Sequence, residues 1–165
     1  MRLSERALTI LLLLGCSVLA SGAVIGQERW LIYTDARGTR AEYPGHVFSV
    51  PQADEAGGRV FTTEDGRARL HMYALDNPER LPPSRFVRKH FPKSRSVLTY
   101  DRVARNFFAI STRRQDLILY VRCNFSAAEG GTLHCVDLSY PAQQKRAWDG
   151  IVTRISRSLR PLPPT

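Results

Sequence analysis

The stretch from Tyr120 to Pro141, YVRCNFSAAEGGTLHCVDLSYP, holds two of the three cysteines of the chain and decides how its last strands pair. Runs rich in branched and aromatic residues flank a glycine-containing loop, a pattern typical of a β-hairpin. If Ser126 faces Thr132 across a five-residue loop, Cys123 lies directly opposite Cys135. Directly opposed strand residues have Cα atoms about 4.5 to 5.5 Å apart, which a disulfide can bridge. The spacing therefore predicts a Cys123–Cys135 disulfide.

The hydrophobic pattern of the same two strands opposes this register. Val121 shares a face with Cys123, whereas Val136 and Leu138 lie on the face away from Cys135. Pairing by hydrophobic pattern alone would shift the register by one residue and put the two sulfur atoms on opposite faces. The two signals agree if both faces of the sheet are covered, or if a bulge intervenes. We therefore expect a sheet with helices on both faces.

Two other roles for these cysteines find less support. A zinc site needs four ligands, and only His134 lies near the cysteines in the sequence. A catalytic cysteine needs a partner histidine, which no motif supplies, and an oxidising compartment would consume the thiol.

The rest of the chain predicts further strands and two helices. Strands are expected over 30–34, 39–44, 96–103 and 106–112, and a hairpin over 58–75 that turns at Asp65-Gly66. Prolines confine a short helix between Pro83 and Pro92. A second helix over 142–159 carries an apolar stripe of Ala147, Trp148, Ile151, Ile155 and Leu159.

The order of four strands, a helix, four strands and a helix indicates an α+β domain built on an antiparallel sheet. We expect a single domain over 27–160 and a short proline-rich tail over 161–165. A domain of this size buries a core without needing many disulfides.

Four segments resemble small exported proteins of Gram-negative bacteria: AEYPGHVFSV (41–50), GRVFTTEDGRARLHMYA (58–74), LTYDRVARNFFAIS (98–111) and LSYPAQQKRAWDGIVTRISRSLRP (138–161). The expected topology is similar to the PsbP-like fold, named for an extrinsic protein of photosystem II and shared by a Ran-binding nuclear import factor. This resemblance implies an α/β/α sandwich. It also implies a protein that works by docking to other proteins, although a fold alone does not carry function.

The N-terminus predicts export. Arg2 and Arg6 precede an apolar run over 7–14 that is too short to span a bilayer. Small residues at 20–23 offer cleavage sites after Ala20 or Ala23, so residues 1–23 form an expected signal peptide. The predicted location is the periplasm or the exterior, where two cysteines usually pair.

A lipoprotein signal is the alternative. The stretch LLGC at 13–16 resembles the lipobox of bacterial lipoproteins, in which the cysteine, here Cys16, becomes the lipid-bearing first residue. The chain would then be anchored to the membrane. In either case Cys123 and Cys135 remain as a pair.

The chain is strongly basic and its cations are mostly arginines. It has 24 Lys and Arg against 15 Asp and Glu, a formal charge of +9. Such a surface favours anionic partners, although an arginine excess also follows from genomic base composition. Nucleic acid is not expected as a partner, because export removes the chain from it and no reading motif is present.

The densest group of cations lies on and around the first predicted helix. Six cations fall within sixteen residues: Arg80, Arg85, Arg88, Lys89, Lys93 and Arg95. Arginine binds phosphate or carboxylate bidentately, so this cluster is the predicted site for an anionic partner. A solvated helix face is the alternative interpretation.

Motifs for catalysis are lacking. The chain has no G-x-S-x-G, Walker glycine loop, H-E-x-x-H or EF-hand loop. The four histidines are isolated in sequence, and His71 and His134 lie on predicted strands. A small hydrolase would need one of these two in a pocket, within hydrogen-bonding reach of an acid. We expect no catalytic residues, metal or cofactor.

These observations predict an exported, non-catalytic binding or accessory module of the bacterial envelope. Its expected partner is an unidentified protein or an anionic envelope component, with membrane contact only through a lipid anchor or the signal segment. A small periplasmic hydrolase with a histidine and carboxylate site is one alternative. An inhibitor or immunity protein is another, and the sequence does not separate it from a binding or accessory module.

Overall fold

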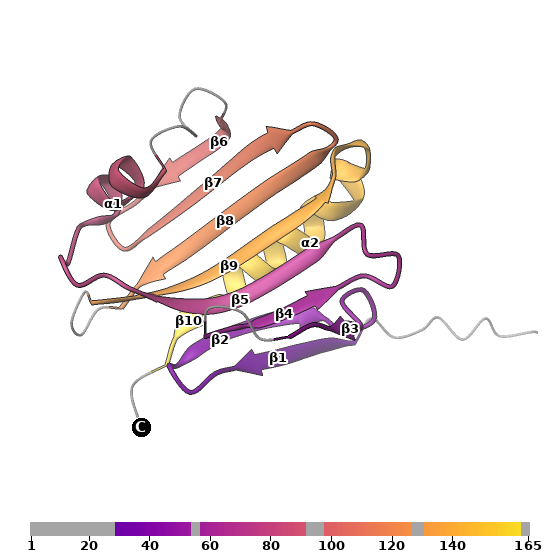
Figure 1. Ribbon diagram of the computed structural model, residues 1–165, viewed down its shortest axis with the longest axis horizontal. Coiled ribbons are helices and arrows are strands. Elements are labelled where there is room, and N and C mark those ends of the chain that lie inside the picture. Colours follow the sequence, from indigo (N-terminus) through magenta and orange to yellow (C-terminus); the bar gives the residue numbers. More distant parts are fainter. Residues whose placement is uncertain (1–28, 54–56, 92–97, 127–130, 163–165) are drawn as a thin grey trace, which may run out of the picture.

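A computed structural model describes residues 29–53, 57–91, 98–126 and 131–162 (Figure 1). The predicted signal peptide, the lipobox with Cys16, and two cations of the predicted cluster, Lys93 and Arg95, lie outside the described residues. The architecture is α+β, with two antiparallel sheets and two α-helices.

The main sheet has seven strands. Their order across the sheet is β3 (Val50–Pro51), β4 (Arg59–Thr62), β5 (Arg69–Asp76), β9 (Thr132–Pro141), β8 (Leu117–Phe125), β7 (Phe107–Arg114) and β6 (Leu98–Val103). The expected hairpin is present, since β4 and β5 pair and Gly66 adopts a positive φ of 67° in the turn between them. Glycine adopts this conformation without a steric penalty.

A second sheet of three strands lies beside the main one. It consists of β1 (Trp30–Thr34), β2 (Thr39–Pro44) and β10 (Arg160–Pro161), with β2 in the centre. The sequence predicted the first two strands but not their separation from the main sheet. It also missed β3 and β10, because a strand of two residues shows no periodicity.

The cysteine register is confirmed. Strands β8 and β9 pair with Cys123 opposite Cys135, and the two cysteines form a disulfide with Cα atoms 4.1 Å apart. Both side chains are fully buried.

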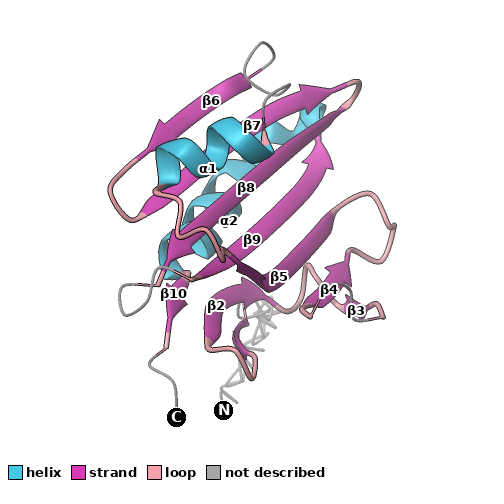
Figure 2. Ribbon diagram, turned by 60° about the vertical axis from the view of Figure 1, so that its left-hand side comes forward, coloured by secondary structure: helices cyan, strands magenta, loops and turns pink. Residues whose placement is uncertain are grey.

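The conflict between the disulfide and the hydrophobic pattern is resolved by burial on both faces of the main sheet (Figures 1 and 2). One face of the main sheet carries the disulfide, Phe108 and Leu133, and helix α1 (Pro83–His90) covers this face. Helix α2 (Lys145–Ser158) and the small sheet cover the other face, which carries Val136 and Leu138. Both strands of the hairpin therefore bury alternate residues on each side, and no shift of register is needed.

Both helices occur where the sequence predicted them. Pro83 lies at the start of α1, where its missing N–H costs no hydrogen bond. The second predicted helix begins with a 3₁₀ turn, Ala142–Gln144, before α2. Its stripe differs from the expected one, because Val152 is buried and Ala147 is exposed. Trp148, Val152 and Ile155 follow the i, i+4, i+7 spacing that directs one narrow face to the sheet.

One carboxylate is buried within the main sheet. The Tyr73 hydroxyl donates a hydrogen bond to Asp137 Oδ2 over 3.0 Å, and Asp137 Oδ1 is buried without a partner among the described residues. Burial raises the pKa of Asp137 to about 6, from an ordinary value of 3.8, against the lowering effects of the Tyr73 hydrogen bond and the Arg69 charge.

The folded protein should therefore lose stability as this carboxyl ionises. A raised folded pKa means that the native state binds the proton more tightly than the unfolded chain does. The protonated Asp137 therefore contributes fully to the free energy of unfolding below about pH 4, and this contribution is lost as the pH rises through about 6. Between pH 4 and pH 7, this effect should lower the free energy of unfolding by about 2 kcal/mol. Urea unfolding of wild type and Asp137→Asn at pH 4 and pH 7 measures it, because the variant should show a smaller fall. Asp101→Asn, an exposed carboxylate on β6, is the control and should keep the wild-type fall.

Candidate functional site

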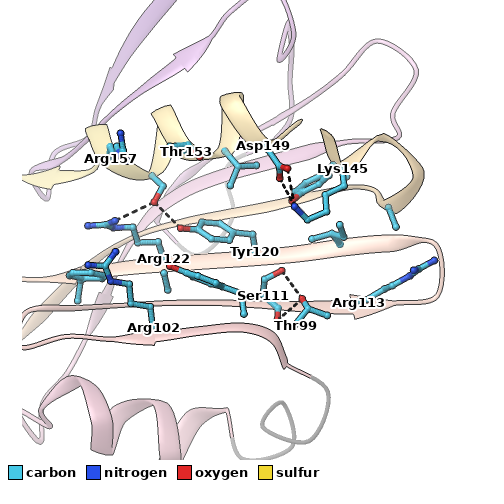
Figure 3. Close-up of a pocket in the computed structure, with 18 residues that line it drawn as sticks. Thr99, Arg102, Ser111, Arg113, Tyr120, Arg122, Lys145, Asp149, Thr153 and Arg157 are labelled. Carbon is cyan, nitrogen blue, oxygen red and sulfur yellow. Dashed lines mark hydrogen bonds and ion pairs between the residues drawn. The ribbon is translucent and has the colours of Figure 1, made fainter. Parts of the chain in front are cut away.

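A groove of about 570 Å³ runs between α2 and the outer strands β6, β7 and β8 (Figure 3). It lies beside the region where α2 and the small sheet pack over β9, β8 and β5. Its lining combines residues of β6, β7 and β8 with residues of α2. The floor of the groove is sheet and one wall is α2. This volume lies within the range typical of small-ligand sites.

The floor carries a row of side chains in which a small residue lies between two arginines. Arg102 of β6 is the partner of Ala109 of β7, and Ala109 is the partner of Arg122 of β8. The three side chains therefore share one face and one level of the sheet. The alanine side chain is short, and Ala109 is only 2% exposed because its neighbours cover it.

Neighbouring neutral groups hold Arg122 in a defined position. Its guanidinium lies over the Phe107 ring, 4.2 Å from the ring centroid, and its Nε donates to Asn124 Oδ1 over 3.0 Å. One terminal nitrogen donates to Ser156 Oγ of α2 over 3.3 Å. The Arg102 guanidinium lies over the same Phe107 ring at 5.5 Å. An arginine has five N–H donors, so Arg122 keeps donors that these contacts do not use.

No acid neutralises these charges. Within the part of the chain that the structure describes, neither Arg102, Arg122 nor Arg157 forms an ion pair with a carboxylate. Burial lowers the pKa of Arg122 and so does the nearby charge of Arg102, against the raising effects of Tyr120 and Tyr100. The acid in the groove, Asp149, is paired with Lys145 over 2.8 Å. The arginine end is therefore a concentration of positive charge that an anion would relieve.

A second row crosses the floor next to the arginines. It consists of Tyr100 of β6, Ser111 of β7 and Tyr120 of β8. The Tyr120 hydroxyl shares a 2.7 Å hydrogen bond with Ser156 Oγ, and burial raises the pKa of Tyr120. Tyr100 remains 45% exposed. The groove thus joins a cationic end to an aromatic section.

The sequence contains a signal for this site that was missed. Strands β6 and β8 both carry the pattern tyrosine, any residue, arginine, as Tyr100-Asp-Arg102 and as Tyr120-Val-Arg122. Residues two apart on a strand share a face, so the repeated pattern predicts two matching pairs if the strands flank a common neighbour. That the common neighbour is β7 follows only from the strand order.

The predicted cation cluster lies elsewhere. Arg85, Arg88 and Lys89 are exposed on α1, and Arg80 is exposed in the turn before it. Lys89 is paired with Glu79. Since α1 covers the disulfide face of the main sheet, this cluster is separated from the groove by the thickness of the sheet (Figure 2). Its role in binding remains a prediction.

The two strand histidines do not meet. His71 of β5 stacks on Tyr73, which belongs to the core beneath α1. His134 of β9 lies on the opposite face, where its Nδ1 is 3.0 Å from the hydroxyl of Thr39 in the small sheet. Burial lowers the pKa of His134. The sheet therefore separates the two histidines. The hydrolase alternative required only one of them near an acid, and His71 is the cross-strand partner of Asp137, so that alternative stays a prediction. Among the described residues, no three His, Cys, Asp or Glu side chains cluster as metal ligands.

Comparison with known proteins gives a likeness in structure alone. No family model matches the chain, and no curated protein matches it in sequence. The solution structure of the cyanobacterial PsbP protein, CyanoP, from Synechocystis sp. PCC 6803 superposes with a TM-score of 0.60 at 15% identity, over 87% of this chain and 99% of that one. The chain has a PsbP-like fold.

The PsbP-like fold confirms the architecture expected from the sequence. A crystal structure of a protein from Bacteroides thetaiotaomicron also matches, at 10% identity and a TM-score of 0.49, over 83% of this chain and 49% of that one. At 15% identity, the likeness to CyanoP shows a shared fold alone, and function must be argued from the site itself.

Proposed function

We propose that this protein is an exported accessory module that binds an anionic partner, without catalysis, in the groove between α2 and strands β6 to β8. A PsbP-like fold supports a module of this kind. The partner's phosphate or carboxylate would lie between Arg102 and Arg122, because planar guanidinium groups bind both anions through paired hydrogen bonds.

The observation that carries the proposal is that Arg122 is half-buried, is held by three neutral contacts, and has no acid partner among the described residues. A buried cation is costly unless it is paired. A structural arginine would find a carboxylate, as Arg154 finds Glu42 at 3.2 Å on the other side of α2. Arg122 instead keeps free donors beside a second unpaired arginine, which favours a site prepared for an anion.

Titration with inorganic phosphate, followed by NMR of the arginine Nε–H groups, tests the groove. The Arg122 signal should move with phosphate, and added sodium chloride should weaken the response. Arg102→Ala combined with Arg122→Ala should weaken phosphate binding at least tenfold, because two charge-assisted hydrogen-bonding groups are lost.

Arg85→Ala combined with Arg88→Ala is the matched control for this experiment. It removes the same charge from α1, on the other face of the sheet. If the control weakens binding and the groove variant does not, the anion site is the cluster on α1 and the groove proposal is wrong. If neither variant changes binding, both sites are excluded.

Export is the second part of the proposal. Its support is the N-terminal sequence, together with a disulfide that suits an oxidising compartment. No helix among the described residues is long and apolar enough to cross a membrane.

Intact mass spectrometry of the protein from its native cells tests export. A mass beginning after Ala20 or Ala23 supports a cleaved signal peptide, and a diacylglycerol mass on Cys16 supports a lipoprotein. A chain that retains Met1 and has free thiols at Cys123 and Cys135 would contradict export in either form.

A further inference from the structure

Strand β6 forms an open edge of the main sheet. It is the last strand in the order, and among the described residues no strand pairs with its outer side (Figures 1 and 2). The opposite edge is β3, which has two residues and contains Pro51. Short strands and prolines protect an edge from further pairing. Strand β6 has six residues and no proline, and after the register shift between Leu98 and Tyr100 it is regular.

The backbone of β6 is turned outward at two of these residues. The Ala104 N–H donates to the Phe107 carbonyl over 2.9 Å, so this pair is hydrogen-bonded. Hydrogen-bonded and non-hydrogen-bonded pairs alternate along an antiparallel ladder. Arg102, two residues before Ala104, therefore turns its N–H and C=O to β7. The N–H and C=O groups of Asp101 and Val103 point away from β7, to the open edge.

The side chains of this edge are exposed as well. Three large apolar side chains among the described residues are exposed, and two of them, Tyr100 and Val103, lie on β6. Neither Asp101 nor Arg102 forms an ion pair within the described part of the chain. Tyr100 and Arg102 line the groove, so the alternate residues face the other side of the sheet. Exposed apolar groups beside open backbone donors and acceptors are typical of an edge that binds.

The open edge and the groove arginines meet on β6. Resting on the proposed function, we infer that β6 binds an extended segment of an acidic protein partner as an additional antiparallel strand. A polypeptide backbone supplies the N–H and C=O groups that match those of Asp101 and Val103. The residue opposite Arg102 then lies in a non-hydrogen-bonded pair, where side chains approach most closely. A glutamate or aspartate at that position pairs its carboxylate with Arg102 at the edge of the groove.

A second copy of this chain fits the edge less well than an acidic partner does. Each copy has a formal charge of +9, so two copies repel each other. The antiparallel register that joins Asp101 of one copy to Val103 of the other also sets the two Arg102 side chains directly opposite each other. Like charges in directly opposed positions destabilise a strand pair. Charge complementarity therefore favours a partner of opposite sign.

A synthetic peptide with blocked ends, Glu-Ile-Glu-Thr-Val-Glu, tests this inference. Paired antiparallel, it sets Ile against Val103, Glu against Arg102 and Thr against Asp101. At saturating peptide, amide hydrogen exchange at Asp101 and Val103 should slow by about tenfold, because both N–H groups gain an acceptor. The Arg102 amide, already bonded to β7, should change less. Unchanged exchange at Asp101 and Val103 would overturn the inference.

The variant Val103→Pro tests whether the backbone carries this binding. It removes one outward N–H and leaves the hydrogen bonds to β7 in place. Peptide binding should weaken by about tenfold, since a hydrogen bond is lost and its acceptor stays unpaired. Val103→Ala is the matched control, which keeps the N–H and should weaken binding by no more than about threefold. An equal loss in both variants would contradict strand addition.

A charge exchange tests the acidic class of the partner. Arg102→Glu should weaken binding of the peptide by about tenfold, because it sets two carboxylates in opposed positions. The peptide Glu-Ile-Lys-Thr-Val-Glu should restore binding to this variant, which shows that the variant is folded. If Arg102→Glu binds the first peptide as wild type does, the partner is not selected by its acid. If it binds neither peptide while its other amides exchange as in wild type, the pairing is wrong.

The failures of the two proposals can be told apart. If phosphate moves the Arg122 signal but the peptide leaves exchange at Asp101 and Val103 unchanged, strand addition is wrong and the groove proposal stands. If the peptide protects both amides but phosphate does not move the Arg122 signal, the groove proposal fails and the edge pairing stands. Protection of these amides that rises with protein concentration, without any peptide, would assign the edge to a second copy and overturn the acidic partner.

Discussion

Replacing Phe108 with alanine should lower the free energy of unfolding by about 3 to 5 kcal/mol, the largest effect expected from a single substitution in this chain. Phe108 is fully buried on β7 and lies at the centre of the core beneath α1. Its ring packs against Phe91 at 5.6 Å, Phe86 at 6.0 Å and Phe125 at 6.2 Å between centroids. Removing it leaves a cavity lined by three rings, which cannot all move inward at once.

Urea unfolding monitored by circular dichroism measures this loss. The midpoint should fall strongly while the slope with denaturant stays constant, as expected for a change in stability alone. A loss below about 1 kcal/mol would mean that α1 and the surrounding rings collapse into the cavity, and that this core is less tightly packed than the ring contacts indicate.

Phe107→Ala is the matched control, one residue away on the same strand. Phe107 points to the opposite face, is partly exposed, and lies beneath the guanidinium groups of Arg102 and Arg122. Its loss should cost less stability than the loss of Phe108, but should release both arginines and weaken phosphate binding. Phe108→Ala, where it remains folded, should bind phosphate like wild type. If Phe108→Ala weakened phosphate binding and Phe107→Ala did not, the assignment of the two residues to opposite faces would be wrong.

Replacing both cysteines with alanine should lower the free energy of unfolding by about 3 kcal/mol and the melting temperature by roughly 10 °C. Cys123 and Cys135 are twelve residues apart, and their link closes the hairpin of β8 and β9 at the centre of the main sheet. Without it the unfolded chain regains the conformations that the closed loop removes. Two fully buried sulfur atoms also leave the core beneath α1.

Thermal unfolding with and without a reducing agent measures this effect. Wild type should lose stability in the reductant and approach the double variant, whereas the double variant should not respond. Equal melting temperatures for the oxidised and reduced wild type would show that the disulfide does not contribute. Because the sulfur atoms lie on the face away from the groove, the double variant at 20 °C should retain phosphate binding.

The cysteine hairpin could be read from the sequence because its information is local. A glycine-containing loop, two strand-like runs and the spacing of Cys123 and Cys135 together specify one register. The mismatch with the hydrophobic pattern then required cover on both faces. The structure meets that requirement with α1 on one side and α2 on the other.

The sequence analysis predicted an anion site on the first helix, and it did not predict the groove. Six cations close together on one predicted helix drew attention to α1, whose described cations are exposed, with Lys89 paired to Glu79. The groove arginines are twenty residues apart in sequence and each has ordinary strand neighbours. Their one local signal is the repeated tyrosine, any residue, arginine pattern, which becomes informative only when the strand order is known. Whether the predicted cluster also binds anions is decided by the α1 control variants.

The sequence by itself determined the elements of this protein: the hairpins, the two helices, the disulfide and the need for a sheet buried on both faces. These follow from periodicity, turn residues and spacing, which act over a few residues. The tertiary structure alone decided that β1 and β2 leave the main sheet, and that α2 packs over β9 and β8 instead of β6 and β7. That choice depends on how whole apolar faces fit together, because the burial of a helix stripe is set by its partners in space and not by its neighbours in the chain. It leaves Arg102 and Arg122 at the groove, on either side of Ala109.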